Sequence, residues 1–282
     1  MRQEKKFQEL NLSDNFLFSA VMEESEICKE VLELLLKIPI EKVTITSEKT
    51  IVTNPEYRGV RMDVYAVDED HSVYNIEMQT TNKGNIPKRS RYYQAQIDAF
   101  HLRPGANFNS LPRSIIIFIC TFDPFEQGRC TYTFENQCLE SEIVLGDGTR
   151  KIFLNTKGDD NETDMEVKQF LKYVEHSTSE FIQHTDSAFI QRLHNQVMMI
   201  KQDRKLEEHY MLFGEMLDDE REQGRQEGLR EGIKEGRQVE REVISKLIRE
   251  MCMDNKLKDI DKLFEDEETL NKMLKKYQIN QL

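Results

Sequence analysis

The stretch GVRMDVYAVDEDHSVYNIEMQT, residues 59–80, decides the fold, because it holds two strand-like runs joined by a polar turn. The runs at 58–67 and 73–80 are rich in β-branched and aromatic residues, and the polar cluster at 68–72 between them suits a hairpin. This part of the chain is therefore predicted to form two antiparallel strands.

Side chains alternate between the two faces of a strand, so each residue of this hairpin can be assigned to a face. Asp63, Glu77 and Gln79 share one face, and antiparallel pairing would bring Asp63 towards Glu77. Two neighbouring carboxylates are a seat for Mg²⁺, which prefers one or two carboxylates together with water and phosphate oxygens. Ordinary charges on a solvent-facing sheet edge are the alternative. The opposite face is apolar and takes Val60, Met62, Val64, Ala66, Tyr74, Ile76 and Met78.

The hairpin lies within a longer series of predicted elements. In chain order these are a helix capped by Ser13 or Asp14, a helix at 26–37, strands at 43–47, 58–67 and 73–80, a helix at 87–102, and strands at 114–122, 143–145 and 151–154. The run at 114–122 is almost wholly apolar, which is typical of a strand buried on both faces. The order of the core is therefore helix, three strands, basic helix, strand.

This order, αβββαβ with acids on the second and third strands, resembles the core of the PD-(D/E)XK nuclease superfamily. More closely, the chain resembles the recombination-promoting nuclease and putative transposase family of bacteria. The resemblance is carried by the stretches 12–16 (LSDNF), 59–66 (GVRMDVYA), 74–79 (YNIEMQ), 89–93 (RSRYY), 152–158 (IFLNTKG) and the glycine–glutamate repeat near the end of the chain. It implies a mixed α/β core with a helical C-terminal extension, and a metal-dependent DNA endonuclease that acts in recombination.

The resemblance also implies the residues of the site. Asp63 and Glu77 would bind Mg²⁺ or Mn²⁺, with the backbone carbonyl of Met78 as a third ligand. The superfamily motif ends in lysine, whereas this chain has Gln79, which can orient a water molecule but has no charge. Lys83, Lys88 or Arg91 are candidates to supply that charge. The alternative is a catalytically weak nuclease fold retained for DNA binding or protein interaction.

The distribution of charge points to DNA at one place only. The net charge of −13, from 39 basic and 52 acidic residues, argues against a protein that coats nucleic acid. Between 83 and 113, however, six basic residues accompany one acid. We expect DNA contacts from this region, or else a solvated helix face. The expected contact residues are Lys83, Lys88, Arg89, Arg91 and Tyr93.

Three parts are predicted along the chain: a nuclease-like domain at 1–158, a helical region at 159–217, and a repeat with C-terminal helices at 218–282. In the last part Gly224, Gly228, Gly232 and Gly236 recur every four residues. Such a stripe lets two helix backbones approach closely, which would suit a homodimer through the C-terminal helices. A flexible linker is the alternative interpretation.

Composition excludes several classes of protein. The longest apolar run, Ile115 to Cys120, has six residues, whereas a membrane helix needs about 20, and the first residues lack the apolar segment of a signal peptide. The five cysteines contain no CxxC pair. We therefore expect buried thiols, no membrane contact and a reducing, cytoplasmic location.

Overall fold

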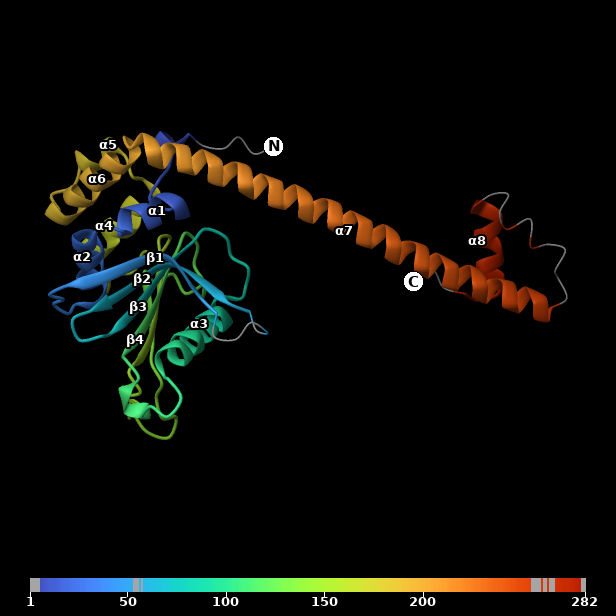
Figure 1. The fold of residues 1–282 in the computed structure, drawn as a ribbon, viewed down its shortest axis with the longest axis horizontal. Helices are drawn as coiled ribbons and strands as arrows, with labels where there is room; N and C mark the ends of the chain where they lie inside the picture. The colour runs from blue at the N-terminus through green and yellow to red at the C-terminus, as the bar shows by residue number, and fades with distance from the viewer. Residues whose placement is uncertain are drawn as a thin grey trace. The chain divides into compact units, whose positions relative to one another are not determined.

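Six strands form one mixed sheet with the order β1-β2-β3-β4-β6-β5 (Figure 1). The computed structural model describes residues 6–52, 56, 58–254, 260, 263 and 267–279. Its strands are β1 (Val43–Ile51), β2 (Val60–Asp68), β3 (Val73–Gln79), β4 (Ser114–Cys120), β5 (Thr131–Phe134) and β6 (Thr149–Asn155). β1, β2 and β3 are antiparallel to one another, β4 is parallel to β3 and β6, and β5 is antiparallel to β6. The predicted mixed α/β fold is confirmed, and so is the predicted order of its core from α1 to β4.

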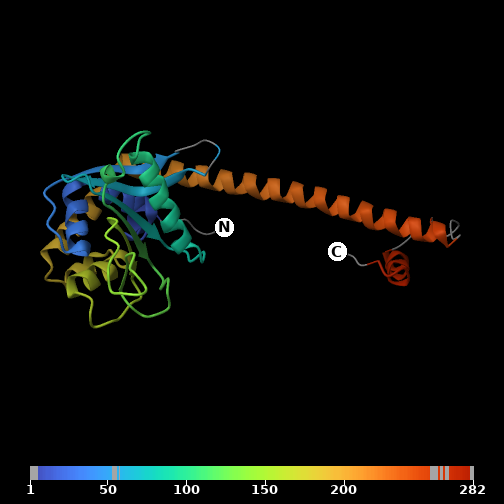
Figure 2. The ribbon, with the colours of Figure 1, turned by 90° about the horizontal axis from the view of Figure 1, so that it is seen from below.

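Helices cover both faces of the sheet (Figures 1 and 2). One face is covered by α1 (Asn15–Met22), α2 (Ser25–Leu36), α4 (Met165–Glu175) and α6 (Ala188–Lys201), with the short α5 (Ser179–Ile182) beside them. The other face is covered by α3 (Ile86–His101). All seven residues of β4 are buried, as predicted for a strand between two layers of helices.

Local sequence signals set the ends of the helices that flank the sheet. The Asp14 carboxylate accepts the backbone N–H groups of Phe16 and Leu17, at 3.0 and 3.2 Å, and thereby caps α1. An N-cap of this kind contributes about 1 kcal/mol. Pro87 stands in the first turn of α3, where its missing N–H leaves no helical hydrogen bond unmade.

One predicted strand is wrong and one strand was not predicted. The stretch 143–145 has a strand-like composition, yet all three side chains are exposed and Val144 makes only an isolated bridge with Gln137. The strand that pairs with β6 is β5, in which Tyr132 is the buried residue. Composition identified a β-prone run, but only the tertiary contacts decide which run reaches the sheet.

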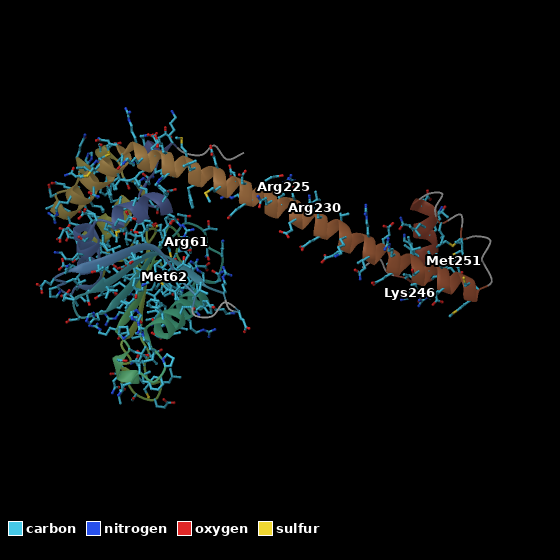
Figure 3. The ribbon with its side chains drawn as sticks, in the orientation of Figure 1. Arg61, Met62, Arg225, Arg230, Lys246 and Met251 are labelled. Atoms are coloured by element: carbon cyan, nitrogen blue, oxygen red, sulfur yellow. The ribbon has the colours of Figure 1, made fainter. Side chains whose placement is uncertain are left out.

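The alternation of side chains along β2 breaks at Asp63, and the prediction that Val60 and Met62 share a face with Val64 is wrong. Val60 and Met62 lie in the core beneath α3, whereas Val64 and Ala66 lie in the core on the opposite face; Met62 is labelled in Figure 3. On β1, Glu48 stands opposite Asp63 and has φ 51°, a left-handed conformation that interrupts the regular pleat. The ladder between β2 and β3 also begins only at Val64.

The chain divides into two compact units, 1–210 and 211–282. The predicted parts, 1–158, 159–217 and 218–282, divide it elsewhere. The reason is that α4 and α6 bury Phe170 and Leu193 in the same apolar core as Ile76 and Ile117 of the sheet. The helices after β6 thus complete the first unit.

In the second unit, α7 (Arg204–Met253), which begins in the first unit, runs as one helix through all four repeat glycines and is followed by α8 (Glu267–Lys276). Leu247 and Met251 near the end of α7 are fully buried against Leu274 of α8, whereas Lys246 is exposed; Met251 and Lys246 are labelled in Figure 3. Among the described residues, no helix combines the length and apolar composition needed to cross a bilayer.

Candidate active site

Two carboxylates join β2 and β3 at the point where the backbone ladder between them ends. The Asp63 N–H donates to Glu77 Oε1 at 3.2 Å, and the Met78 N–H donates to Asp63 Oδ2 at 3.0 Å. Side-chain oxygens thus accept the hydrogen bonds that carbonyl oxygens accept elsewhere in the sheet. The predicted approach of Asp63 to Glu77 is present, and it uses backbone amides as well as side chains.

Arg89 of α3 lies over the same two strands and connects the remaining polar groups. Its guanidinium donates to Gln79 Oε1 at 2.7 Å, to Glu77 Oε2 at 3.3 Å and to the Tyr93 hydroxyl at 2.9 Å. The Glu77 side chain is 2% exposed, whereas that of Arg89 is 29% exposed. Arg89 therefore pairs with a buried carboxyl while part of its own side chain remains exposed to solvent.

The electrostatics of the two carboxyls differ from those of surface acids. Burial, reinforced by the neighbouring charge of Asp63, raises the pKa of Glu77 to about 8, although Arg89 acts in the opposite direction. Burial also raises the pKa of Asp63, opposed by the Met78 amide and Arg89. Two carboxyls with raised pKa values in one notch form a site that is short of positive charge.

The donor set fits a hard divalent cation. Asp63 and Glu77 supply carboxylate oxygens. The Met78 carbonyl directly follows Glu77 in the chain, and in this structure it accepts a hydrogen bond from the Gln79 amide at 2.7 Å. A carbonyl oxygen has a second lone pair, and Mg²⁺ keeps several waters, so two carboxylates and one carbonyl suffice. Within the described residues there is no group of three or more His, Cys, Asp or Glu side chains suited to a metal.

A groove of about 600 Å³ opens beside this cluster, between the start of β2 and the first turns of α3. Four of its nine described lining residues are basic, namely Arg58, Arg61, Lys88 and Arg89, and Arg61 also forms a salt bridge with Glu48. Arg58 and Arg61, the latter labelled in Figure 3, were not singled out from the sequence. Both lie beside Gly59 and Val60 at the start of β2. Their basic charge next to the strand that carries Asp63 is the sequence feature that could have identified them.

The predicted DNA-contact residues occupy different environments. Lys83, Lys88 and Arg91 are exposed, but Lys83 and Arg91 lie outside the lining of the groove. Tyr93 is 9% exposed and packs in the core beneath α3, so its hydroxyl supports Arg89 at the groove wall. Among the described residues, none of Lys83, Lys88 and Arg91 forms a salt bridge or hydrogen bond with the carboxylates; the cation beside Glu77 and Gln79 is Arg89.

Comparison with known protein families bears directly on this arrangement. The family model of the PD-(D/E)XK nuclease family transposases matches residues 15–224, which is most of the chain and includes every residue of the site. The chain belongs to this family. Its members are nucleases, a class that acts on DNA and generally uses divalent metals, which agrees with the paired acids of the PD-(D/E)XK site. Searches of curated proteins and of solved structures found no match.

Proposed function

We propose that this PD-(D/E)XK protein is a metal-dependent DNA endonuclease that hydrolyses phosphodiester bonds. The observation that carries the proposal is the pairing of Asp63 and Glu77 across β2 and β3, with Arg89 beside them. A family match alone would not distinguish an intact site from a decayed one. Here Asp63 and Glu77 are linked through hydrogen bonds, and Arg89 donates hydrogen bonds to both Glu77 and Gln79.

Asp63 and Glu77 would hold Mg²⁺, or Mn²⁺ in its place, with the Met78 carbonyl as third ligand. When bound, the ion polarises the scissile phosphate and lowers the pKa of the attacking water. Burial of Glu77 prepares the site for this role, because a buried carboxylate gains more from a nearby cation than an exposed one does. The chain therefore supplies a preformed pair of carboxyl ligands.

Gln79 and Arg89 together would replace the lysine of the superfamily motif. The Gln79 side chain can turn from the Met78 carbonyl to orient a water molecule, and Arg89 supplies the positive charge that an amide lacks. A guanidinium beside the reacting phosphate would stabilise the charge that develops in the transition state. We thus replace the earlier candidates for that charge, Lys83, Lys88 and Arg91, with Arg89.

DNA would bind along the basic groove, with its backbone phosphates near Arg58, Arg61 and Lys88. The groove adjoins the carboxylates through Arg89, which lines it and also contacts Glu77. Lys83 and Arg91 are exposed on either side of Lys88 in the chain and would extend the contact with a longer duplex. Tyr93 would act through Arg89.

The test is plasmid nicking by the purified protein with Mg²⁺ and with EDTA. Asp63→Asn is the decisive variant, because an amide oxygen still accepts the Met78 N–H while the charge that would hold the metal is lost. We expect nicking in Mg²⁺ and none in EDTA or in the variant. Asp70→Asn, in the exposed turn after β2, is the matched control and should retain full activity. Cleavage that survives Asp63→Asn would overturn the assignment.

A DNA-binding module without activity is the second candidate, favoured by the hydrogen bond that holds the Gln79 amide to Arg89 instead of leaving it free. Calorimetry distinguishes the two functions. An endonuclease should bind Mn²⁺ in the absence of DNA, whereas a binding module should bind DNA and give no heat with the metal.

We also propose a role in recombination, homodimerisation through the C-terminal helices and a cytoplasmic location. The description of the family as transposases supports recombination, since transposition requires strand cleavage. Two nuclease sites in one dimer would suit a double-strand break. Five free cysteines, three of them buried, suit a reducing compartment. A recombination assay that compares wild type with Asp63→Asn tests the first of these roles.

A further inference from the structure

Asn75 is a buried polar residue with no hydrogen-bond partner. It lies on β3 between Tyr65 of β2 and Ile116 of β4, and its side chain is 0% exposed. Neither its amide nitrogen nor its amide oxygen completes a hydrogen bond. A buried polar group left unpaired costs about 1–3 kcal/mol, so an unpaired amide at the centre of a sheet requires an explanation.

The position of Asn75 relative to Glu77 supplies that explanation. The two residues are separated by one position on the same strand, so their side chains project from the same face. The Asn75 amide lies close enough to Glu77 to act as a hydrogen-bond donor that lowers the pKa of its carboxyl, although the two side chains do not meet in good hydrogen-bond geometry. In this structure the two Glu77 oxygens accept from the Asp63 N–H and from Arg89.

Arg89 is the partner of Glu77 that can leave. Its side chain is 29% exposed and lines the groove, whereas Glu77 is held in the sheet. If Arg89 turns towards a phosphate in the groove, Glu77 Oε2 loses a donor while it remains buried. A carboxylate accepts up to about four hydrogen bonds, and Asn75 carries two unused donors beside it.

We propose that Asn75 is a positioning residue, whose amide donates to Glu77 when Arg89 engages DNA and so keeps the carboxylate oriented for a divalent metal. This inference rests on the proposed function. In the loaded site the amide would gain a well-formed hydrogen bond that it lacks in this structure. Groups that orient a metal ligand typically change metal affinity 10–100-fold when removed.

The test is Mn²⁺ binding, by calorimetry with DNA lacking a cleavable bond, to wild type and to Asn75→Leu. Leucine has the branching and the number of heavy atoms of asparagine but no polar group, and it is somewhat larger. We expect affinity for Mn²⁺ to fall about tenfold, and the nicking rate of the variant to return to that of wild type at saturating Mn²⁺. Thermal stability should stay equal or rise, because an unpaired buried amide is removed. Ser47→Ala, which removes another unpaired buried group, is the matched control and should leave affinity unchanged.

The outcomes separate this inference from the proposed function. Wild type that binds no Mn²⁺ would overturn both. Wild type that binds Mn²⁺ together with Asn75→Leu of equal affinity would overturn the role of Asn75 alone. Should leucine prevent folding, Asn75→Ala also lacks the donor and is read in the same way: a tenfold loss supports the role, and unchanged affinity refutes it.

Discussion

At the scale of single residues, Arg89 is the side chain that connects the Asp63–Glu77 pair with the basic groove. It contacts Glu77 and Gln79 on one side and lines the basic groove on the other. Lys88 is its neighbour in the same groove and, within the described residues, forms no salt bridge with an acid. The two residues therefore allow binding and chemistry to be separated.

Lys88→Ala should weaken DNA binding without slowing cleavage of bound DNA. Loss of one phosphate contact lowers the slope of log affinity against log salt by about 0.9. Arg89→Met should instead reduce the cleavage rate at saturating DNA by about 10²-fold, as expected when a charge that stabilises the transition state is removed. Binding titrations at four salt concentrations and single-turnover nicking test both. Equal losses of rate in the two variants would contradict the division of roles.

A second prediction at this scale follows from the pKa of Glu77, which burial and Asp63 raise from 4.5 to about 8. The folded protein then binds this proton more tightly than the unfolded chain, so metal-free stability falls as the pH rises from about 4.5 to about 8. Glu77→Gln has no such charge. Without metal, its melting temperature should exceed that of wild type increasingly over this range, by several degrees at pH 8.

Thermal unfolding in EDTA at pH 5, 6, 7 and 8 measures that difference. A gap between the two proteins that does not change with pH would show that Glu77 keeps an ordinary pKa. Added Mn²⁺ should narrow the gap at pH 8, because wild type alone retains the full ligand set.

The sequence predicts part of this site and not the rest. The prediction from strand alternation placed Asp63 near Glu77, because the pairing of two strands joined by a short turn is a local property of the chain. The role of Arg89 depends on how α3 packs on the sheet, which no local pattern states. Arg89 lies four residues before Tyr93 and eight before Ile97, which places it on the buried face of that helix. The helical spacing of these residues could therefore have indicated that Arg89 faces the sheet.

At the scale of elements, predictions succeeded where hydrophobic pattern and turn chemistry agree. The hairpin of β2 and β3, the buried β4 and the helix after Pro87 are examples. The face switch of β2 at Asp63 was not predictable from β2 itself, because the left-handed residue that accompanies it, Glu48, lies on β1. Strand periodicity fails here because the irregularity involves a neighbouring strand, which the local pattern of β2 does not contain.

The glycines of α7 provide the test at this scale. A Cβ added at Gly228 or Gly232 would meet no atom within 4 Å, so alanine fits the single chain without strain. Each replacement should stabilise the helix by about 1 kcal/mol, because alanine loses less entropy than glycine. Circular dichroism of the double variant Gly228→Ala, Gly232→Ala at low concentration should show a higher melting temperature. A lower one would mean that these glycines are packed against something.

At the scale of the whole molecule, the open question is assembly. The α7 helix carries exposed Leu229 and Ile233 four residues apart, and their stripe leads on to Val243 and Leu247. Arg225 and Arg230, labelled in Figure 3, are among the basic residues on this part of the helix. Val243 and Leu247 pack with α8, whereas Leu229 and Ile233 do not belong to that core. This arrangement supports the proposed contact between two copies.

Light scattering on the full chain and on a chain that ends at Asp218 should give a dimer and a monomer. The double alanine variant of α7 should weaken the dimer, because two added methyl groups would separate backbones that glycine lets approach. Equal monomeric masses for the full and shortened chains would refute assembly through these helices, while leaving the nuclease site untouched.

The hydrogen bond from the Met78 N–H to Asp63 has a consequence for observation. In a regular β ladder a backbone amide is protected from solvent hydrogen exchange by a carbonyl that cannot move away. At Met78 the protecting group is a carboxylate whose charge and orientation change with what it binds. The exchange rate of this one amide, and its proton chemical shift, would therefore act as a built-in reporter of site occupancy, readable without any measurement of cleavage.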